Sequence, residues 1–486
     1  MAVSEDMFFL DSNFEGTLQQ QIQSLVAEGI LSGRFRPGEK LPSSRRLARH
    51  LGISRITVTL AYTELQADDY ITSKGRSGYY VSDTAPQPRI GQGRREESDA
   101  VDWAGRIGTR FTEAPQLAKP EDWHRFRYPF IYGQTDPSLF DHANWRLCAL
   151  QALGLRNFDA MTSDYFERDD PKLVEFIARH SLPRRGILAN PDEILVTLGA
   201  QNALWLAAEV LLGGGRRAVI ERPCYPGLSG ILSLTRCDVE AVDVDEGGLK
   251  VDDVPASADV VFVTPSHHCP TTVTMPLTRR RALLKRAAQD DFLVVEDDYE
   301  FEMSFVTPPS PALKSLDTEG RVIHIGSFSK SLFPGLRLGY MVGSRAFIRE
   351  ARALRAAILR HPPGHIQRTA ATFMSLGHYD ALIKRTATAY KRRRRIMATA
   401  FEEHGLEVGG GGGEGGSSFW MQAPEGVDTR ELAARLLDDS VLIEPGAPFF
   451  AGEANPPSRY FRLAYSSIPD ARIPEGVARI ARAVKA

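Results

Sequence analysis

The chain is poor in cysteine and has no long hydrophobic run. Both absences limit the classes of protein to which it can belong. Its 486 residues include four cysteines, at positions 148, 224, 237 and 269. No two of them have the C-x-x-C spacing of zinc or thioredoxin-like sites, and so few scattered thiols favour a reducing compartment. No apolar run approaches the ~20 residues of a membrane span. The first residues, MAVSEDMFFLD, lack the basic and apolar regions of a secretory signal. We therefore expect a cytoplasmic protein that has no metal site and no membrane partner.

The chain also lacks a strong net charge, but its charges are unevenly distributed. The formal net charge is −2, with 43% hydrophobic and 25% charged residues, which is typical of a globular protein. Residues 34–81 nevertheless carry nine Lys or Arg against four Asp or Glu, a local excess of five positive charges. A basic segment inside a near-neutral chain indicates a surface that contacts phosphates.

The basic segment has the pattern of a winged helix-turn-helix. Apolar residues at helical spacing predict a first helix within residues 18–30, and two short helices joined by a turn at Gly52 follow it. The last of these helices should direct its N-terminal residues into the major groove, namely Ser54, Arg55, Thr57 and Thr59. Two β-rich runs then flank a basic hairpin tip that can approach the DNA backbone or the minor groove and contains Lys74, Gly75 and Arg76.

Two stretches of this segment, LPSSRRLARHLGISRITVTLAYTEL and GYYV, closely resemble the winged domain of GntR-type bacterial regulators. The resemblance covers residues 14–81. It implies DNA contacts from Arg45, Arg55, Thr57, Lys74 and Gly75. Phosphate contacts position such a domain, whereas Arg55 can read a guanine edge. The alternative is a three-helix domain with a solvated basic face.

The remainder of the chain has a different pattern. The stretch from residue 82 to residue 102 is rich in Pro, Gly, Ser and mixed charge, as in a flexible linker. From about residue 125 onward, short apolar runs alternate with helical segments, which predicts an α/β fold with a mostly parallel sheet. We expect a DNA-binding domain over residues 1–82, a linker over residues 83–124 and an α/β domain over residues 125–486.

Polar residues follow several of the predicted strands, and their types fit a phosphorylated aldehyde cofactor. Functional residues of such sheets lie at the carboxyl ends of the strands. The amine of Lys330 can condense with an aldehyde, and Asp297 can pair with a pyridine nitrogen. Tyr299 can hydrogen-bond a ring hydroxyl, and Tyr225 can stack on the ring. A phosphate would be held by a helix N-terminus, hydroxyl groups and a guanidinium group, from Gly199, Ala200, Gln201, Ser327, Ser329 and Arg337.

Each of these features alone also fits ordinary structure, such as a turn glycine, a solvated acidic loop or a surface lysine. In this order they resemble the fold-type I pyridoxal 5'-phosphate aminotransferases over residues 125–486, most specifically in SFSKSLFPGLRLG and EDDYE. The resemblance implies that Lys330 forms the Schiff base and that Asp297 pairs with the pyridine nitrogen. It also implies a smaller C-terminal subdomain, in which Arg462 of YFRLAYS binds the α-carboxylate of an amino-acid ligand.

The sequence departs from these enzymes at TPSHHCPTT, residues 264–272. Aminotransferases commonly carry Asn-Pro-Thr-Gly there, but Cys269 precedes the proline and Thr272 replaces the glycine. Because a thiol is a poor hydrogen-bond donor, we expect His268 to contact the cofactor hydroxyl instead. Cys269 can also be a plain buried apolar residue. The departure favours cofactor binding without efficient transamination.

A GntR-like domain followed by an aminotransferase-like domain is the plan of the MocR/GabR group of transcription regulators, and the resemblance covers the whole chain. It implies a homodimer, with a head-to-tail arrangement as one option, that binds operator DNA. A primary amine or amino acid would displace Lys330 and form an external aldimine, with at most a half-transamination. The start of the chain, FFLDSNFEGTLQQQIQ, also resembles taurine- and ectoine-utilisation members.

Two alternatives remain open. One is an active aminotransferase with an appended DNA-binding module, and the other is a regulator whose cofactor pocket is vestigial. The tract KRRRR at residues 391–395 could also contact nucleic acid. On a helix, however, such charges point all round, so we expect most of them to be solvated or paired with acids.

Overall fold

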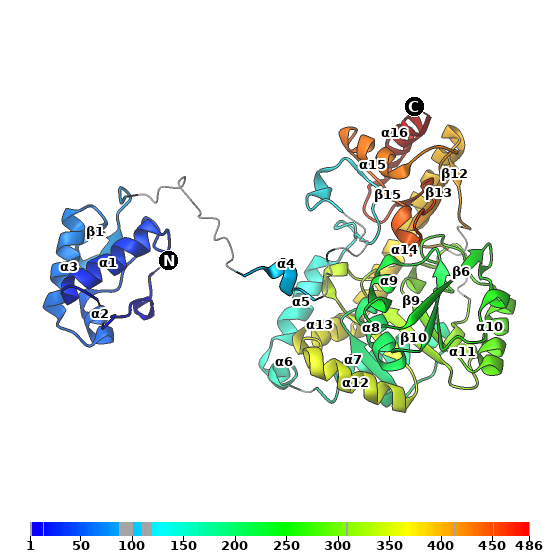
Figure 1. The fold of residues 1–486 in the computed structure, drawn as a ribbon, viewed down its shortest axis with the longest axis horizontal. Coiled ribbons are helices and arrows are strands. Elements are labelled where there is room, and N and C mark those ends of the chain that lie inside the picture. The colour runs from blue at the N-terminus through cyan, green and yellow to red at the C-terminus, as the bar shows by residue number, and fades with distance from the viewer. Residues whose placement is uncertain are drawn as a thin grey trace. The chain divides into compact units, whose positions relative to one another are not determined.

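The computed structural model describes residues 2–12, 14–86, 101–108, 112, 119–164, 166–307, 310–411, 415–450 and 452–485. The chain forms two compact units, residues 1–110 and 111–486, which Figure 1 shows in blue and in cyan to red. The stretch between residues 86 and 101, which belongs to the predicted linker, lies outside the described residues. No helix in the described part of the chain is long and apolar enough to cross a membrane.

The N-terminal unit is a winged helix-turn-helix, as predicted. Its helices are α1 (Leu18–Leu31), α2 (Ser44–Leu51) and α3 (Arg55–Ala67), and its wing is formed by β1 (Ile71–Ser73) and β2 (Tyr79–Val81). Side chains preceding each helix satisfy backbone N–H groups of the first turn, namely Thr17, Ser43 and Ser54. Gly52 ends α2 at φ +68°, a left-handed conformation that glycine adopts without strain. This cap sets the sharp turn into α3.

The C-terminal unit contains an eight-stranded, mostly parallel sheet. Along the sheet the order is β4-β11-β10-β9-β8-β5-β6-β7, and among these strands only β11 and β7 pair antiparallel to their neighbours. The strands are β4 (Ile194–Thr197), β5 (Arg217–Arg222), β6 (Asp238–Asp245), β7 (Gly248–Leu249), β8 (Val260–Val263), β9 (Leu293–Asp298), β10 (Val322–Ser327) and β11 (Gly339–Val342). The predicted α/β fold class is therefore confirmed.

Helices cover both faces of this sheet, which explains why its strands read as continuous apolar runs. Val295 packs with α8, α9 and α12 on one face, and its neighbour Val294 packs with α10 on the other. The helices of this layer structure are α5 (His142–Ala152), α6 (Phe158–Thr162), α7 (Pro171–Phe176), α8 (Ala200–Leu211), α9 (Pro226–Leu232), α10 (Leu277–Asp290), α11 (Leu313–Leu316), α12 (Arg345–Leu359) and α13 (Gly364–Ser375).

A smaller C-terminal subdomain follows the long helix α14 (His378–His404). Its antiparallel sheet has the order β12-β13-β16-β15, and a short parallel pair joins β3 to β14. Its elements are β3 (Tyr128–Pro129), β12 (Glu407–Val408), β13 (Ser418–Gln422), β14 (Val441–Leu442), β15 (Glu444–Pro445), β16 (Tyr460–Ala464), α15 (Thr429–Asp438) and α16 (Ile473–Lys485). Figure 1 shows this subdomain at the top of the C-terminal unit, in orange and red.

The basic tract at residues 391–395 lies in α14, and part of it is paired with acids, as expected. Arg393 is buried and forms ion pairs with Asp136 and Asp470. Arg392 also pairs with Asp470. These two arginines therefore hold α14 to its neighbours.

A buried ion pair ties α12 to the sheet, and we expect its loss to destabilise the C-terminal unit strongly. Asp169 accepts hydrogen bonds from Arg355 at 2.6 Å, from Arg352 at 2.9 Å and from the backbone N–H of Val196 at 3.1 Å. The Asp169→Ala variant leaves the fully buried Arg355 uncompensated, which costs about 3–5 kcal/mol. Urea unfolding followed by circular dichroism measures this loss.

The matched control is Asp192→Ala, because Asp192 pairs with Arg345 at 3.0 Å while both side chains are more than half exposed. An exposed pair contributes about 0–1 kcal/mol. Equal losses of stability in the two variants would contradict the role given to Asp169.

Candidate functional site

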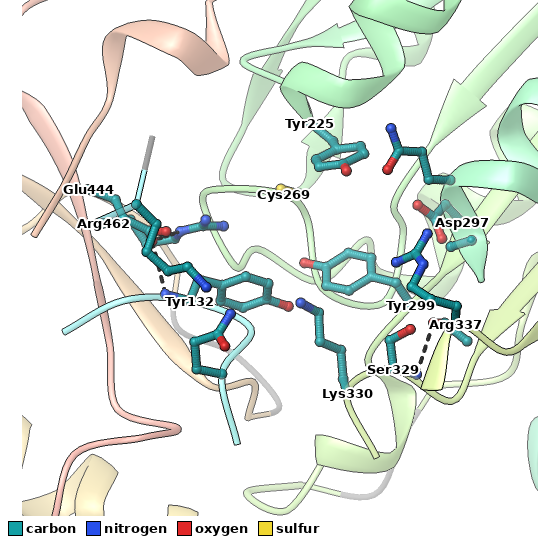
Figure 2. Close-up of a pocket in the computed structure, with 15 residues that line it drawn as sticks. Tyr132, Tyr225, Cys269, Asp297, Tyr299, Ser329, Lys330, Arg337, Glu444 and Arg462 are labelled. Carbon is teal, nitrogen blue, oxygen red and sulfur yellow. Dashed lines mark hydrogen bonds and ion pairs between the residues drawn. The ribbon is translucent and has the colours of Figure 1, made fainter. Parts of the chain in front are cut away.

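A cavity of about 260 Å³ lies between the carboxyl ends of the central strands and the C-terminal subdomain (Figure 2). Ten of the residues predicted from the sequence line it: Ala200, Gln201, Tyr225, Asp297, Tyr299, Ser327, Ser329, Lys330, Arg337 and Arg462. Five further residues complete the lining: Lys119, Tyr132, Gln134, Cys269 and Glu444. Side chains from distant parts of the sequence thus converge on one cavity.

Lys330 lies in the turn that follows β10, and its Nζ atom lies 4.1 Å from the centroid of the Tyr132 ring. Burial lowers the pKa of Lys330 to about 8, although the nearby Glu300 carboxylate opposes this shift. A lowered pKa increases the fraction of neutral amine, which is the nucleophilic form.

Gly133 lies directly against the amine of Lys330. This residue has φ +77°, and a Cβ atom there would lie 2.4 Å from the Lys330 amine. Any other residue would be strained at this φ and would displace the flexible end of the Lys330 side chain.

Asp297 is the penultimate residue of β9 and carries an unsatisfied carboxyl group. Its Oδ1 atom is buried and has no hydrogen-bond partner among the described residues. Burial, together with the neighbouring Asp298 carboxylate, raises the pKa of Asp297 to about 7. A buried carboxyl group that lines a cavity and lacks a donor fits a ligand that carries a protonated ring nitrogen.

The residues predicted to hold a phosphate meet at the start of α8. Gly199 precedes the helix at φ +80°, and a Cβ atom there would lie 3.4 Å from Nη2 of Arg337 and 3.6 Å from Oγ of Ser329. Arg337 donates to the carbonyl of Leu198 at 3.1 Å. The Ser329 hydroxyl is buried without a partner in the described part of the chain. A helix N-terminus, a guanidinium and an unsatisfied hydroxyl together suit an anion.

His268 does not line the cavity, contrary to the contact expected for it. Its Nδ1 atom lies 2.6 Å from the Thr271 hydroxyl, and its Nε2 atom lies 3.5 Å from Glu221. Cys269 lines the cavity, whereas its neighbour His268 is buried outside that lining. Burial lowers the pKa of His268 to about 3. His268 is therefore not placed to make the expected contact with a cofactor hydroxyl.

The aromatic residues predicted to contact the ring both reach the cavity. Tyr225 precedes α9, and Tyr299 follows β9. The Tyr299 hydroxyl donates a hydrogen bond to the carbonyl of His267 at 2.9 Å, which leaves its oxygen free to accept one from a ligand.

Sequence reasoning missed Tyr132, Glu444 and Gly133. Their segments carry no chemical motif, and they reach the cavity only through the packing of the C-terminal subdomain. Two local signals were present. The glycine of IYG precedes a polar stretch, and a carboxylate stands directly before the Pro-Gly turn of IEPG.

The predicted DNA contacts lie on the winged unit. Arg45, Arg55, Lys74 and Gly75 are exposed, and Thr57 is half-buried. The hydroxyl of Ser54 accepts from the N–H of Ile56, and the hydroxyl of Thr59 donates to the carbonyl of Arg55. The side chain of Arg76 lies outside the described residues.

One exposed residue of this surface was not predicted. Ile56, in the first turn of α3, is 71% exposed. An apolar side chain there suits contact with a thymine methyl group.

In the described part of the chain, no group of three or more His, Cys, Asp or Glu side chains is placed to hold a metal ion.

The family comparisons also divide the chain into an N-terminal and a C-terminal part, and the boundary between the two structural units falls between the two matches. Residues 18–81 match the gntR family of bacterial regulatory proteins, and residues 149–480 match aminotransferase class I and II. The HTH-type transcriptional regulator TauR of Rhodobacter capsulatus is 56% identical over 485 residues, covering 100% of both chains. The probable rhizopine catabolism regulatory protein MocR of Rhizobium meliloti is 27% identical over 440 residues, covering 90% of this chain and 86% of the relative.

Two of the solved structures that are similar to the chain are aminotransferases. Kynurenine aminotransferase of Pyrococcus horikoshii, in complex with PMP, has a TM-score of 0.70 and 27% identity, covering 79% of this chain and 98% of that chain. LysN, the α-aminoadipate aminotransferase of Thermus thermophilus, complexed with N-(5'-phosphopyridoxyl)-L-leucine, has a TM-score of 0.71 and 26% identity with the same coverage. Both proteins hold a phosphopyridoxyl group.

Proposed function

This chain belongs to the MocR/GabR group of GntR-type transcription regulators, and on that premise we propose that its C-terminal unit binds pyridoxal 5'-phosphate and senses an amine. It is a transcription regulator with a DNA-binding domain. One observation carries the cofactor proposal. An amine of lowered pKa, a buried carboxyl group without a donor and an anion-binding helix N-terminus share one cavity.

The residues present fit the cofactor group by group. Asp297 would accept from the pyridine nitrogen, and Tyr225 and Tyr299 would contact the ring. The phosphate would lie at the start of α8, between Ser329 and Arg337. When bound, the cofactor supplies an aldehyde carbon that condenses with primary amines. Lys330 would hold that carbon until an effector amine replaces it.

Arg462 supports an effector that carries an acidic group as well as an amine. Its Cζ atom lies 4.1 Å from the centroid of the Tyr132 ring, which is also the distance of the Lys330 Nζ atom from that centroid. Both cations therefore lie against the same ring. A short amino acid or an aminosulfonate such as taurine carries both groups that these cations would take, an amine and an acidic group. An effector of this class would join the Lys330 end of the cavity to the Arg462 end.

We propose a sensing role rather than sustained transamination, with at most one half-reaction. Cys269 lines the cavity where aminotransferases commonly have an asparagine, and its thiol is a weak donor to a cofactor hydroxyl. The runner-up, an active aminotransferase, is supported by the likeness to solved enzymes. Repeated turnover of an amino acid and a keto acid would favour that second candidate.

A homodimer is part of the same proposal. Leu147 and Leu150 of α5 are 62% and 56% exposed, and Leu155 nearby is 88% exposed. Such a group of exposed leucines suits a surface that a second copy covers. Two copies would present two winged domains to paired half-sites.

Cofactor loading tests the proposed function. Purified protein is titrated with pyridoxal 5'-phosphate, and visible absorption is recorded before borohydride reduction and peptide mass analysis. We expect a saturable visible band and a reduced adduct on Lys330. A protein that stays colourless at saturating cofactor, or an adduct on another lysine, would contradict the proposal.

A further inference from the structure

The end of the cavity that contains Arg462 also holds an ion pair, which the proposed function does not use. Glu444 and Arg462 are direct neighbours across β15 and β16. Oε2 of Glu444 accepts a hydrogen bond from Nε of Arg462 at 2.8 Å and one from the N–H of Tyr132 at 3.2 Å. The Glu444 side chain is 13% exposed and that of Arg462 is 4% exposed. This ion pair is therefore almost fully removed from bulk water.

Two aromatic rings fix the guanidinium group as well. Its Cζ atom lies 4.1 Å from the centroid of the Tyr132 ring and 4.8 Å from that of the Phe449 ring. Within the described residues, only Nε of Arg462 donates a hydrogen bond, so Nη1 and Nη2 are available to a ligand. Figure 2 shows this pair on one side of the cavity, with Asp297 and Arg337 on the other.

The charges around the cavity are nearly all assigned once the cofactor groups are placed. Asp297, Lys330 and Arg337 serve the ring, the aldehyde and the phosphate. Of the remaining charged residues that line the cavity, Arg462 is buried, Glu444 is partly buried and Lys119 is exposed. The effector end thus offers one buried cation, and a carboxylate already neutralises its charge.

We propose that Glu444 determines effector specificity by admitting amines with one anionic group and disfavouring amines with a second one. This inference rests on the proposed function. The first anionic group takes Nη1 and Nη2 of Arg462 while Glu444 holds the guanidinium group by Nε. A second anionic group finds no unpaired buried cation among the described lining residues and meets the Glu444 charge. Repulsion between like charges a few ångströms apart in a partly buried site weakens binding roughly tenfold or more.

Matched ligand pairs isolate this effect. Aspartate is β-alanine with one added carboxylate, and glutamate is γ-aminobutyrate with one added carboxylate. The cofactor-loaded protein is titrated with all four, and the change in visible absorption gives each dissociation constant. For the wild type we expect the amine with one carboxylate to bind roughly tenfold or more tightly than its partner with two.

The Glu444→Gln variant removes the charge and keeps an oxygen that can accept from Arg462 and Tyr132. We expect it to reduce the preference about tenfold, mainly by strengthening binding of aspartate and glutamate. Glu444→Ser also removes the charge and serves as the test if the glutamine variant folds poorly. Glu444→Asp keeps the charge and should retain the preference for amines with one carboxylate. Glu453→Gln is the control, because Glu453 lies in the same subdomain, pairs with Arg222 and does not line the cavity.

The outcomes distinguish a failure of the proposed function from a failure of the role given to Glu444. If no amine changes the absorption of the wild type, the proposed function fails, and this inference fails with it. If amines bind but the preference is the same in wild type and Glu444→Gln, only the role of Glu444 is overturned. An equal gain for all four ligands would also overturn it, because Glu444 would then merely compete with every anion for Arg462.

Discussion

The Lys330→Ala variant should lose covalent cofactor attachment and all response of operator binding to amines, while it still binds the operator. Lys330 is the lysine that lines the cavity beside Asp297, and its pKa is lowered to about 8 by burial. Alanine removes the amine and leaves a small space, so we expect the fold to persist. Visible absorption, mass analysis after borohydride reduction and fluorescence anisotropy with labelled operator DNA measure the three properties.

Lys285→Ala is the matched control for this variant, because Lys285 is an exposed lysine on α10. It should keep the visible band and the amine response of the wild type. A Lys330→Ala protein that still carries a cofactor adduct, or whose operator binding still responds to amines, would contradict the role of Lys330. It would also favour a regulator with a vestigial pocket.

The Arg55→Ala variant should lose sequence-specific operator binding without unfolding. Arg55 begins α3, and its side chain is exposed. Among the described residues, its side chain has a single long hydrogen bond of 3.4 Å, from Nε to the Ser44 hydroxyl. A bidentate contact of arginine to guanine contributes about 1–3 kcal/mol of discrimination. We therefore expect the ratio of operator binding to nonspecific binding to fall about 5- to 150-fold.

Anisotropy titrations with operator and scrambled DNA at one fixed salt concentration measure this ratio, because phosphate contacts vary steeply with salt. Arg34→Ala is the control, since Arg34 is an exposed arginine of the same basic segment that precedes the helix-turn-helix. We expect Arg34→Ala to weaken the binding of operator DNA and of scrambled DNA equally. An unchanged ratio in Arg55→Ala, with thermal unfolding like that of the wild type, would show that Arg55 does not read a base.

The sequence was sufficient to predict the elements and the residues that follow the strands. Val294 and Val295 pack on opposite faces of the sheet, so β9 appears in the sequence as an unbroken apolar run. Asp297 lies at the carboxyl end of that strand, one residue before its last, and Lys330 follows the next strand. In a parallel sheet both must therefore reach the same edge. Local periodicity together with the order of the motifs determined this part of the site.

The remaining part of the site depends on register and on side-chain direction, which local patterns do not contain. Glu444 meets Arg462 only because β15 and β16 pair in one particular register. Tyr132 joins them through a loop that follows the pairing of β3 with β14. The error at His268 has a similar cause. The order of residues gives the chemistry of the thiol at Cys269 but not which of these two neighbouring side chains reaches the cavity.

The central claim is that one amine-binding event at the cavity changes the affinity for DNA. A single measurement follows both properties on the same sample: cofactor-loaded protein with labelled operator DNA is titrated with β-alanine or taurine while absorption and anisotropy are recorded. We expect both signals to change with the same midpoint and the operator affinity to change about 5- to 150-fold, which corresponds to a coupling of about 1–3 kcal/mol. If the absorption change saturates while the operator affinity stays constant, the cavity binds amines without regulating DNA binding, and the account is wrong.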